Sequence, residues 1–144
     1  MQPLNFDDVL NKLLESDPRY HRDAYAFLRD SLEFTQKVIS KANKNQVRHI
    51  TGRELLNGIR EYALITFGPM TTTVFEEWGI RSCEDFGNMV FLMVENNLLR
   101  KQEKDSMDDF KSAYSFDEAF RKPFLPAGKN AVERAPQTTE VEKN

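Results

Sequence analysis

The sequence predicts a mainly α-helical fold of about five helices, followed by a small β-hairpin and a disordered C-terminal tail. Apolar residues recur at spacings of three and four along most of the chain before Asn97, which is typical of amphipathic helices. Capping residues and glycine steps divide these stretches into separate helices. After Arg121 the chain is rich in Pro and charged residues and cannot bury enough apolar surface to offset the entropy of ordering. We therefore expect one domain over residues 1–122 and disorder over residues 123–144.

Two amphipathic helices open the chain. Asn5 can cap the first helix, which we expect over residues 6–15. Asp17 as a cap and Pro18 as the first helical residue begin the second helix, which continues to about Ala42. The apolar residues of the second helix fall on one face and are expected to be buried: Tyr20, Ala24, Phe27, Leu28, Leu32, Phe34, Val38 and Ile39.

The clearest helix start in the sequence is at Thr51. Thr51 and Glu54 have the spacing of a capping box, in which each side chain satisfies a free backbone N–H of the helix start. This third helix is predicted to continue to Phe67. Just before it, the alternation of apolar and polar residues over residues 47–50 predicts a very short strand.

Glycine and asparagine steps delimit the next two helices. The fourth is predicted over residues 69–78, before a Gly79-Ile80 step that is typical of a Schellman motif. Ser82 opens the fifth helix with a second capping box, and Asn96-Asn97 ends it. Because residues 86–94 are apolar on most sides, we expect this helix at the centre of the fold.

The segment after the fifth helix predicts a β-hairpin. Its two strands are expected over residues 99–103 and 110–115. The alternative is a single helical turn over residues 106–111. Ser115 then has the spacing of a last capping box, for a short helix to about Phe120.

The composition is that of a soluble protein of the cell interior. With 144 residues, 40% of them hydrophobic and 11% aromatic, the chain can build one packed core. No apolar run approaches the roughly 20 residues that span a bilayer, so we expect no membrane partner. The acidic N-terminus does not resemble a secretory signal. The single cysteine, Cys83, has no partner for an internal disulfide, and we expect a cytoplasmic location.

Short motifs spread over roughly Asp17 to Pro126 carry a resemblance to a known family. They are His49-Ile50-Thr51-Gly52-Arg53-Glu54-Leu55-Leu56, Tyr62-Ala63, Phe67-Gly68-Pro69-Met70, Trp78-Gly79-Ile80-Arg81, Cys83-Glu84-Asp85-Phe86-Gly87, Asp105-Ser106, Asp109-Phe110, Tyr114 and Phe116-Asp117-Glu118-Ala119-Phe120. In these motifs the sequence resembles an uncharacterised, conserved-hypothetical bacterial family of planctomycete and verrucomicrobial lineages. The resemblance implies no activity, cofactor or partner. Separately, the order of helices, short strand and hairpin is similar to that of winged-helix domains, a likeness of topology alone.

Patterns that carry catalysis or metal binding are missing from the sequence. His21 and His49 are far apart, and neither has a second histidine at helical spacing. Adjacent carboxylates at residues 76–77, 84–85 and 108–109 would point to different sides of a helix. No glycine-rich phosphate-binding loop is present. We expect a protein that is not an enzyme and has no cofactor and no metal site.

Cys83 is the one candidate for nucleophilic chemistry. It falls in the first turn of the fifth predicted helix, where the helix dipole lowers the pKa of a thiol. No residue pattern supplies a base or an oxyanion hole for it. A buried structural cysteine is therefore the simpler interpretation.

Two binding hypotheses follow, and we favour a non-catalytic protein-interaction or adaptor module. Phe120, Phe124 and Leu125 stand among basic and Pro residues, and they are the candidates for contact with their own domain, with a second copy of the chain or with another protein. The alternative is nucleic-acid binding, by a winged-helix-like protein, through a predicted basic face. That face consists of Lys37, Lys41, Lys44, Arg48 and Arg53.

Overall fold

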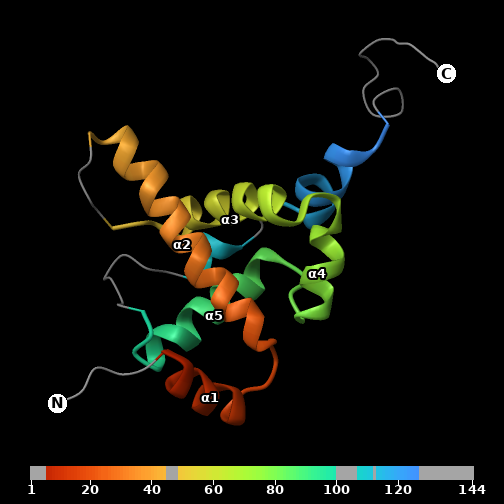
Figure 1. Ribbon diagram of the computed structural model, residues 1–144. Helices are drawn as coiled ribbons and strands as arrows, with labels where there is room; N and C mark the ends of the chain where they lie inside the picture. Colours follow the sequence, from red (N-terminus) through yellow and green to blue (C-terminus); the bar gives the residue numbers. More distant parts are fainter. Residues whose placement is uncertain (1–5, 45–48, 100–106, 112, 127–144) are drawn as a thin grey trace.

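The computed structural model describes residues 6–44, 49–99, 107–111 and 113–126, and these form a mainly helical fold (Figure 1). The described residues contain five α-helices and no strand. The α-helices are α1 (Phe6–Ser16), α2 (Arg22–Ala42), α3 (Gly52–Phe67), α4 (Thr71–Glu77) and α5 (Cys83–Glu95). Four short helical turns complete the fold: η1 (Gly68–Met70), η2 (Met107–Phe110), η3 (Asp117–Arg121) and η4 (Lys122–Phe124).

The two strongest capping signals in the sequence are confirmed. The Thr51 hydroxyl accepts the backbone N–H of Glu54 at 3.1 Å, and the Glu54 carboxylate accepts the backbone N–H of Thr51 at 3.0 Å. At the start of α5 the Asp85 carboxylate accepts the backbone N–H of Ser82 at 3.2 Å. Both helices therefore begin where side chains satisfy backbone donors that the helix leaves unpaired.

The ends of α4 and α5 are also confirmed, and both are Schellman motifs. Gly79 has a φ of +86°, and the backbone N–H of Ile80 donates to the carbonyl of Phe75 at 2.8 Å. Asn97 takes the same role after α5 with a φ of +62°, and Leu98 N–H donates to the carbonyl of Met93 at 2.8 Å. Asparagine tolerates this left-handed conformation better than most residues with a side chain.

The predicted start of the second helix is wrong by four residues. Asp17 does not cap it, because its carboxylate pairs with the Arg19 guanidinium at 2.8 Å. His21 is the N-cap instead, and its Nδ1 accepts the backbone N–H of Asp23 at 3.0 Å. The fourth helix likewise begins at Thr71, after the separate turn η1.

The predicted hairpin is wrong where the structure describes it. Because a winged-helix topology needs this hairpin, the described residues do not support that likeness. Residues 110–115 contain no strand, and Phe110 ends the helical turn η2, as in the alternative that the sequence left open. A helical turn seats the Phe110 ring, 3% exposed, over Gly52 and Gly87, where a Cβ atom would lie within 3.0 Å of it. The rest of the hairpin, residues 100–106, lies outside the described residues.

Two other predictions fall partly outside the described residues. Of the predicted short strand, residues 47 and 48 are not described, and His49 and Ile50 have no regular secondary structure. Of the predicted tail, residues 127–144 are not described. Its first residues belong to η4, so helical structure extends two residues past the predicted domain end.

The core is aromatic and is centred on Phe75 of α4, which is fully buried. Five other rings lie within 5.3 to 6.1 Å of the Phe75 ring centroid: those of Phe27, Trp78, Phe86, Phe116 and Phe120. Such tilted and edge-to-face ring pairs add to the free energy of burial. Helix α5 lies among the other elements, as its apolar sequence predicts (Figure 1). Within the described residues, no helix is both long and apolar enough to cross a bilayer.

The predicted apolar stripe of α2 is buried only in part. Ala24 and Leu28 are buried, whereas Phe34 and Ile39 are half-buried and Val38 is 48% exposed. The expectation of a buried Val38 is therefore wrong.

Candidate functional site

The predicted partner segment is divided between the core and the surface. Phe120 is fully buried, and its ring packs edge-on against Phe75, Tyr114 and Phe116. Phe120 thus anchors the segment on its own domain and is not available to a partner. Leu125 is half-buried, and Phe124 is 46% exposed.

Phe124 belongs to an end of the molecule where apolar side chains meet solvent. Figure 1 shows residues 117–124 beside η1 and the C-terminal end of α3. Ile65 in the last turns of α3 is 73% exposed, and Met70 of η1 is 56% exposed. Of the four large apolar side chains that are exposed in the described part of the chain, three belong to this part of the fold: Ile65 to α3, Met70 to η1 and Phe124 to η4. We call Ile65, Met70 and Phe124 the apolar end.

The described residues of the predicted basic face belong to two parts of the fold, the end of α2 and the start of α3. Lys37 and Lys41 are exposed on the last turns of α2, and Lys44 is exposed after them. Arg53 is exposed on α3 and acts electrostatically on Cys83 of α5. Arg48 lies outside the described residues. The side of α3 that faces α2 also carries the carboxylates of Glu54 and Glu61.

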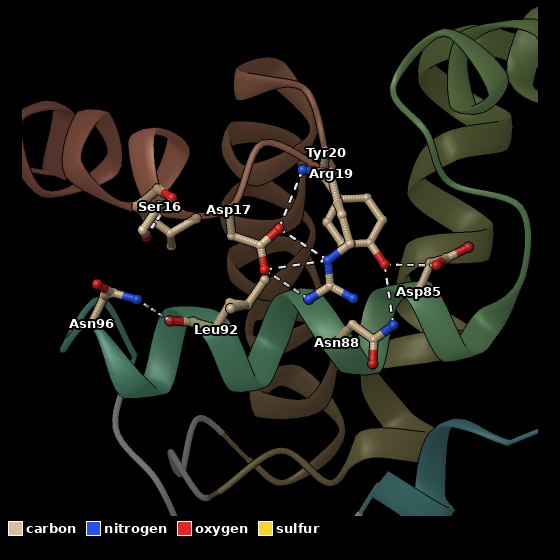
Figure 2. A network of polar contacts seen from close by, with 9 residues as sticks. Ser16, Asp17, Arg19, Tyr20, Asp85, Asn88, Leu92 and Asn96 are labelled. Carbon is tan, nitrogen blue, oxygen red and sulfur yellow. Dashed lines mark hydrogen bonds and ion pairs between the residues drawn. The ribbon is translucent and has the colours of Figure 1, made fainter.

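A network of polar contacts joins the turn between α1 and α2 to α5 (Figure 2). The Tyr20 hydroxyl donates to the Asp85 carboxylate at 2.6 Å and accepts from the Asn88 amide at 3.1 Å. Burial, together with the bond to Asp85, raises the pKa of Tyr20 to about 12. Beside it, the Asp17 carboxylate is held by the Arg19 guanidinium, which lowers the pKa of Asp17. These groups bind one another, so the network fixes the turn on α5.

Cys83 lies at the start of α5, as predicted, but only 1% of it is exposed. Its thiol donates to the carbonyl oxygen of Tyr114 at 3.4 Å. Burial raises the pKa of Cys83, which opposes the effect of the helix dipole. Because the thiolate is the reactive form, this position favours the structural interpretation of Cys83.

The histidines and the adjacent carboxylates considered for catalysis or metal binding lie in different parts of the fold. His21 caps α2, and His49 is exposed before α3. Asp108 pairs with Lys111 at 3.1 Å, on an exposed turn. Within the described residues, no group of three or more His, Cys, Asp or Glu side chains is placed to hold a metal ion.

The sequence reasoning missed two of the three residues of the apolar end. Ile65 carried a usable signal, because helical spacing places it opposite the buried face formed by Leu56, Ile59 and Ala63. Met70 carried no such signal, since it lies in a three-residue turn and not in a long helix.

Comparison of the chain with protein-family models, with curated proteins and with solved structures gave no significant match. The resemblance to a bacterial family of planctomycete and verrucomicrobial lineages therefore stays a prediction.

Proposed function

We propose that this protein is a non-catalytic protein-interaction module that binds a partner protein through the apolar end. The observation that carries the proposal is the exposure of Ile65, Met70 and Phe124, on the neighbouring elements α3, η1 and η4, in a domain whose other large apolar side chains are mostly covered. Single exposed apolar residues are ordinary on protein surfaces, whereas several together mark a binding surface.

The anchoring of the C-terminal segment supports this proposal. Phe120 fixes η3 in the core, and the Arg121 guanidinium pairs with the Asp117 carboxylate at 2.7 Å within the same turn. Phe124 follows directly in η4 and is thus presented from an ordered backbone. A partner then loses less free energy to ordering the surface that it binds.

The test is affinity purification of the full chain from native lysate, with nuclease treatment, followed by mass spectrometry. We expect defined proteins to remain bound to the wild type and to be lost from an Ile65→Ser/Phe124→Ser double variant. The matched control is Val38→Ser, which removes the fourth exposed apolar side chain and is expected to retain the same proteins. Equal capture by all three proteins would refute the proposed surface.

Nucleic-acid binding is the second proposal, and exposed Lys37, Lys41 and Lys44 favour it. This proposal predicts that the chain captures nucleic acid, which nuclease removes, and that the captured amount falls steeply as the salt concentration rises. Reversal of Lys41 and Lys44 to Glu should then abolish capture, whereas the Ile65→Ser/Phe124→Ser variant should retain it. Salt-insensitive capture that survives nuclease excludes this alternative.

A further inference from the structure

A groove separates the C-terminal half of α2 from the N-terminal half of α3. Its volume is about 190 Å³. Phe34, Val38 and Ile39 give it an apolar wall on α2, and the wall on α3 is polar. The complete lining is Phe34, Thr35, Val38, Ile39, Glu54, Asn57, Gly58 and Glu61.

Contacts along the two helices show that they are antiparallel across this groove. Phe34 and Tyr62 have ring centroids 5.3 Å apart. One turn on, the helices approach so closely that a Cβ on Gly58 would lie 1.7 Å from the Thr35 hydroxyl oxygen. In the same antiparallel order, Val38 and Ile39 of α2 lie across the groove from Glu54 of α3. The last turns of α2 are thus covered by α3 on one side only.

The two rims of the groove carry opposite charges. Helical spacing places Lys37 and Lys41 beside Val38 on the α2 rim. Glu54 and Glu61, seven residues apart, line the α3 rim on one stripe. Lys37, Lys41 and Glu61 form no ion pair with any residue that the structure describes.

This arrangement is complementary to itself. A two-fold axis that runs along the groove, between two facing copies, places the α2 rim of each copy over the α3 rim of the other. Each copy's Lys37 and Lys41 then face carboxylates of its partner, and the two Val38 side chains meet at the centre. We propose that the groove is a homodimer interface with a second copy of this chain as its occupant.

The charge pattern favours a second copy over an occupant of one charge sign. A basic peptide would be attracted to the Glu61 side and repelled by Lys37 and Lys41, and nucleic acid would meet the reverse. Only a surface with a basic strip, an apolar strip and an acidic strip matches both rims, and the chain itself has that surface. The proposal does not depend on the proposed function, because Lys37, Lys41 and Val38, which carry it, are not residues of the apolar end.

The first experiment measures the mass of the purified full chain by sedimentation equilibrium over a wide range of concentrations. We expect the average mass to rise from that of a monomer toward that of a dimer. Val38→Asp places a charge at the centre of the interface and should weaken association by at least about tenfold. Circular dichroism checks that the variant keeps the helical fold, which an exposed position should permit.

The decisive experiment uses two charge-reversed variants. Lys37→Glu/Lys41→Glu makes the α2 rim acidic, and Asn57→Lys/Glu61→Lys makes the α3 rim mainly basic. Each variant alone should associate at least about tenfold more weakly than the wild type, because symmetry repeats every repulsion. Mixed in equal amounts, the two should form a heterodimer, since both rims then meet opposite charges.

Three outcomes would overturn the proposal. One is a wild type that stays monomeric at the highest concentration reached. The second is a dimer that Val38→Asp does not weaken, which would place the interface elsewhere. The third is a mixture of the two charge variants that associates no better than either alone, which would show that the rims do not meet.

Discussion

The two ends of α2 differ sharply although one amphipathic pattern runs through the whole helix. At the N-terminal end Tyr20, just before the helix, is 3% exposed, and Ala24 and Leu28 are at most 1% exposed. At the C-terminal end Val38 is 48% exposed, and Phe34 and Ile39 are only half-buried. Apolar spacing specifies which face of a helix turns inward. How completely that face is buried depends on what packs against it.

The N-terminal end is closed because turns from distant parts of the chain meet there. The backbone N–H of His21 donates to the carbonyl of Trp78 at 3.1 Å, and Tyr20 reaches α5 through Asp85. At the C-terminal end of α2 the groove beside α3 stays open. The difference predicts that substitutions at the closed end change stability, whereas those at the open end change association.

The largest effect on the closed end should come from Gly79→Ala. Gly79 combines a φ of +86° with close packing, since a Cβ would lie 2.6 Å from the Arg19 carbonyl oxygen. Backbone strain and this clash together should lower the free energy of unfolding by about 3–5 kcal/mol. Urea denaturation followed by circular dichroism measures the loss.

Gly68 tests a positive φ without a clash, in a different backbone conformation with a ψ of −131°. Its φ is +54°, but a Cβ there would meet nothing within 4 Å. Gly68→Ala should therefore cost only about 1–3 kcal/mol. A loss of less than about 1 kcal/mol for Gly79→Ala would mean that the Arg19 contact contributes little to the closed end.

Local signals in the sequence predicted the limits of most helices. The capping box at Thr51 and the Gly79-Ile80 step each involve residues a few positions apart, so neighbouring residues determine their geometry. The fold beyond these limits depends on distant contacts. The sequence around Phe110 does not indicate that its ring fits over Gly52 and Gly87. Residues 110–115 were therefore predicted to form a strand.

The candidate site was predictable to a smaller degree for the same reason. An apolar segment among prolines indicated a contact region, and the segment does contain exposed Phe124. The sequence could not distinguish Phe124 from Phe120, because their exposure depends on whether the Phe75 cluster has room for a ring. Burial of Cys83 is likewise a property of its packing against distant residues such as Tyr114, which is 31 positions away in the sequence.

An intermediate effect should follow from Tyr20→Phe. The substitution keeps the ring and removes the hydrogen bonds to Asp85 and Asn88. We expect a loss of about 1–2 kcal/mol in the free energy of unfolding at pH 7. Tyr62→Phe is the control, since the hydroxyl of half-buried Tyr62 has no hydrogen bond within the described residues, and its loss should be smaller.

The same tyrosine should make the wild type sensitive to alkali. Its pKa is about 12 in the folded chain against 10.0 for the free side chain, so folding favours the protonated form. This stabilisation is complete below pH 10 and is lost as the pH rises from about 10 to about 12. Burial raises the pKa values of Tyr25 and Tyr114 as well, which adds to the loss. Urea midpoints measured across this range should fall for the wild type and fall less for Tyr20→Phe.

The smallest effect is expected at the open end, from Val38→Ala. Since Val38 is 48% exposed, truncation removes little buried surface and should lower the free energy of unfolding by no more than about 0.5 kcal/mol. Leu28→Ala, on the same helix but 1% exposed, should cost about 2–5 kcal/mol. Both are measured at low protein concentration, because dimerisation would otherwise add to the apparent stability. If Val38→Ala still cost more than about 1 kcal/mol there, the side chain would have to be buried within the monomer. The contrast between the two ends of α2 would then be wrong.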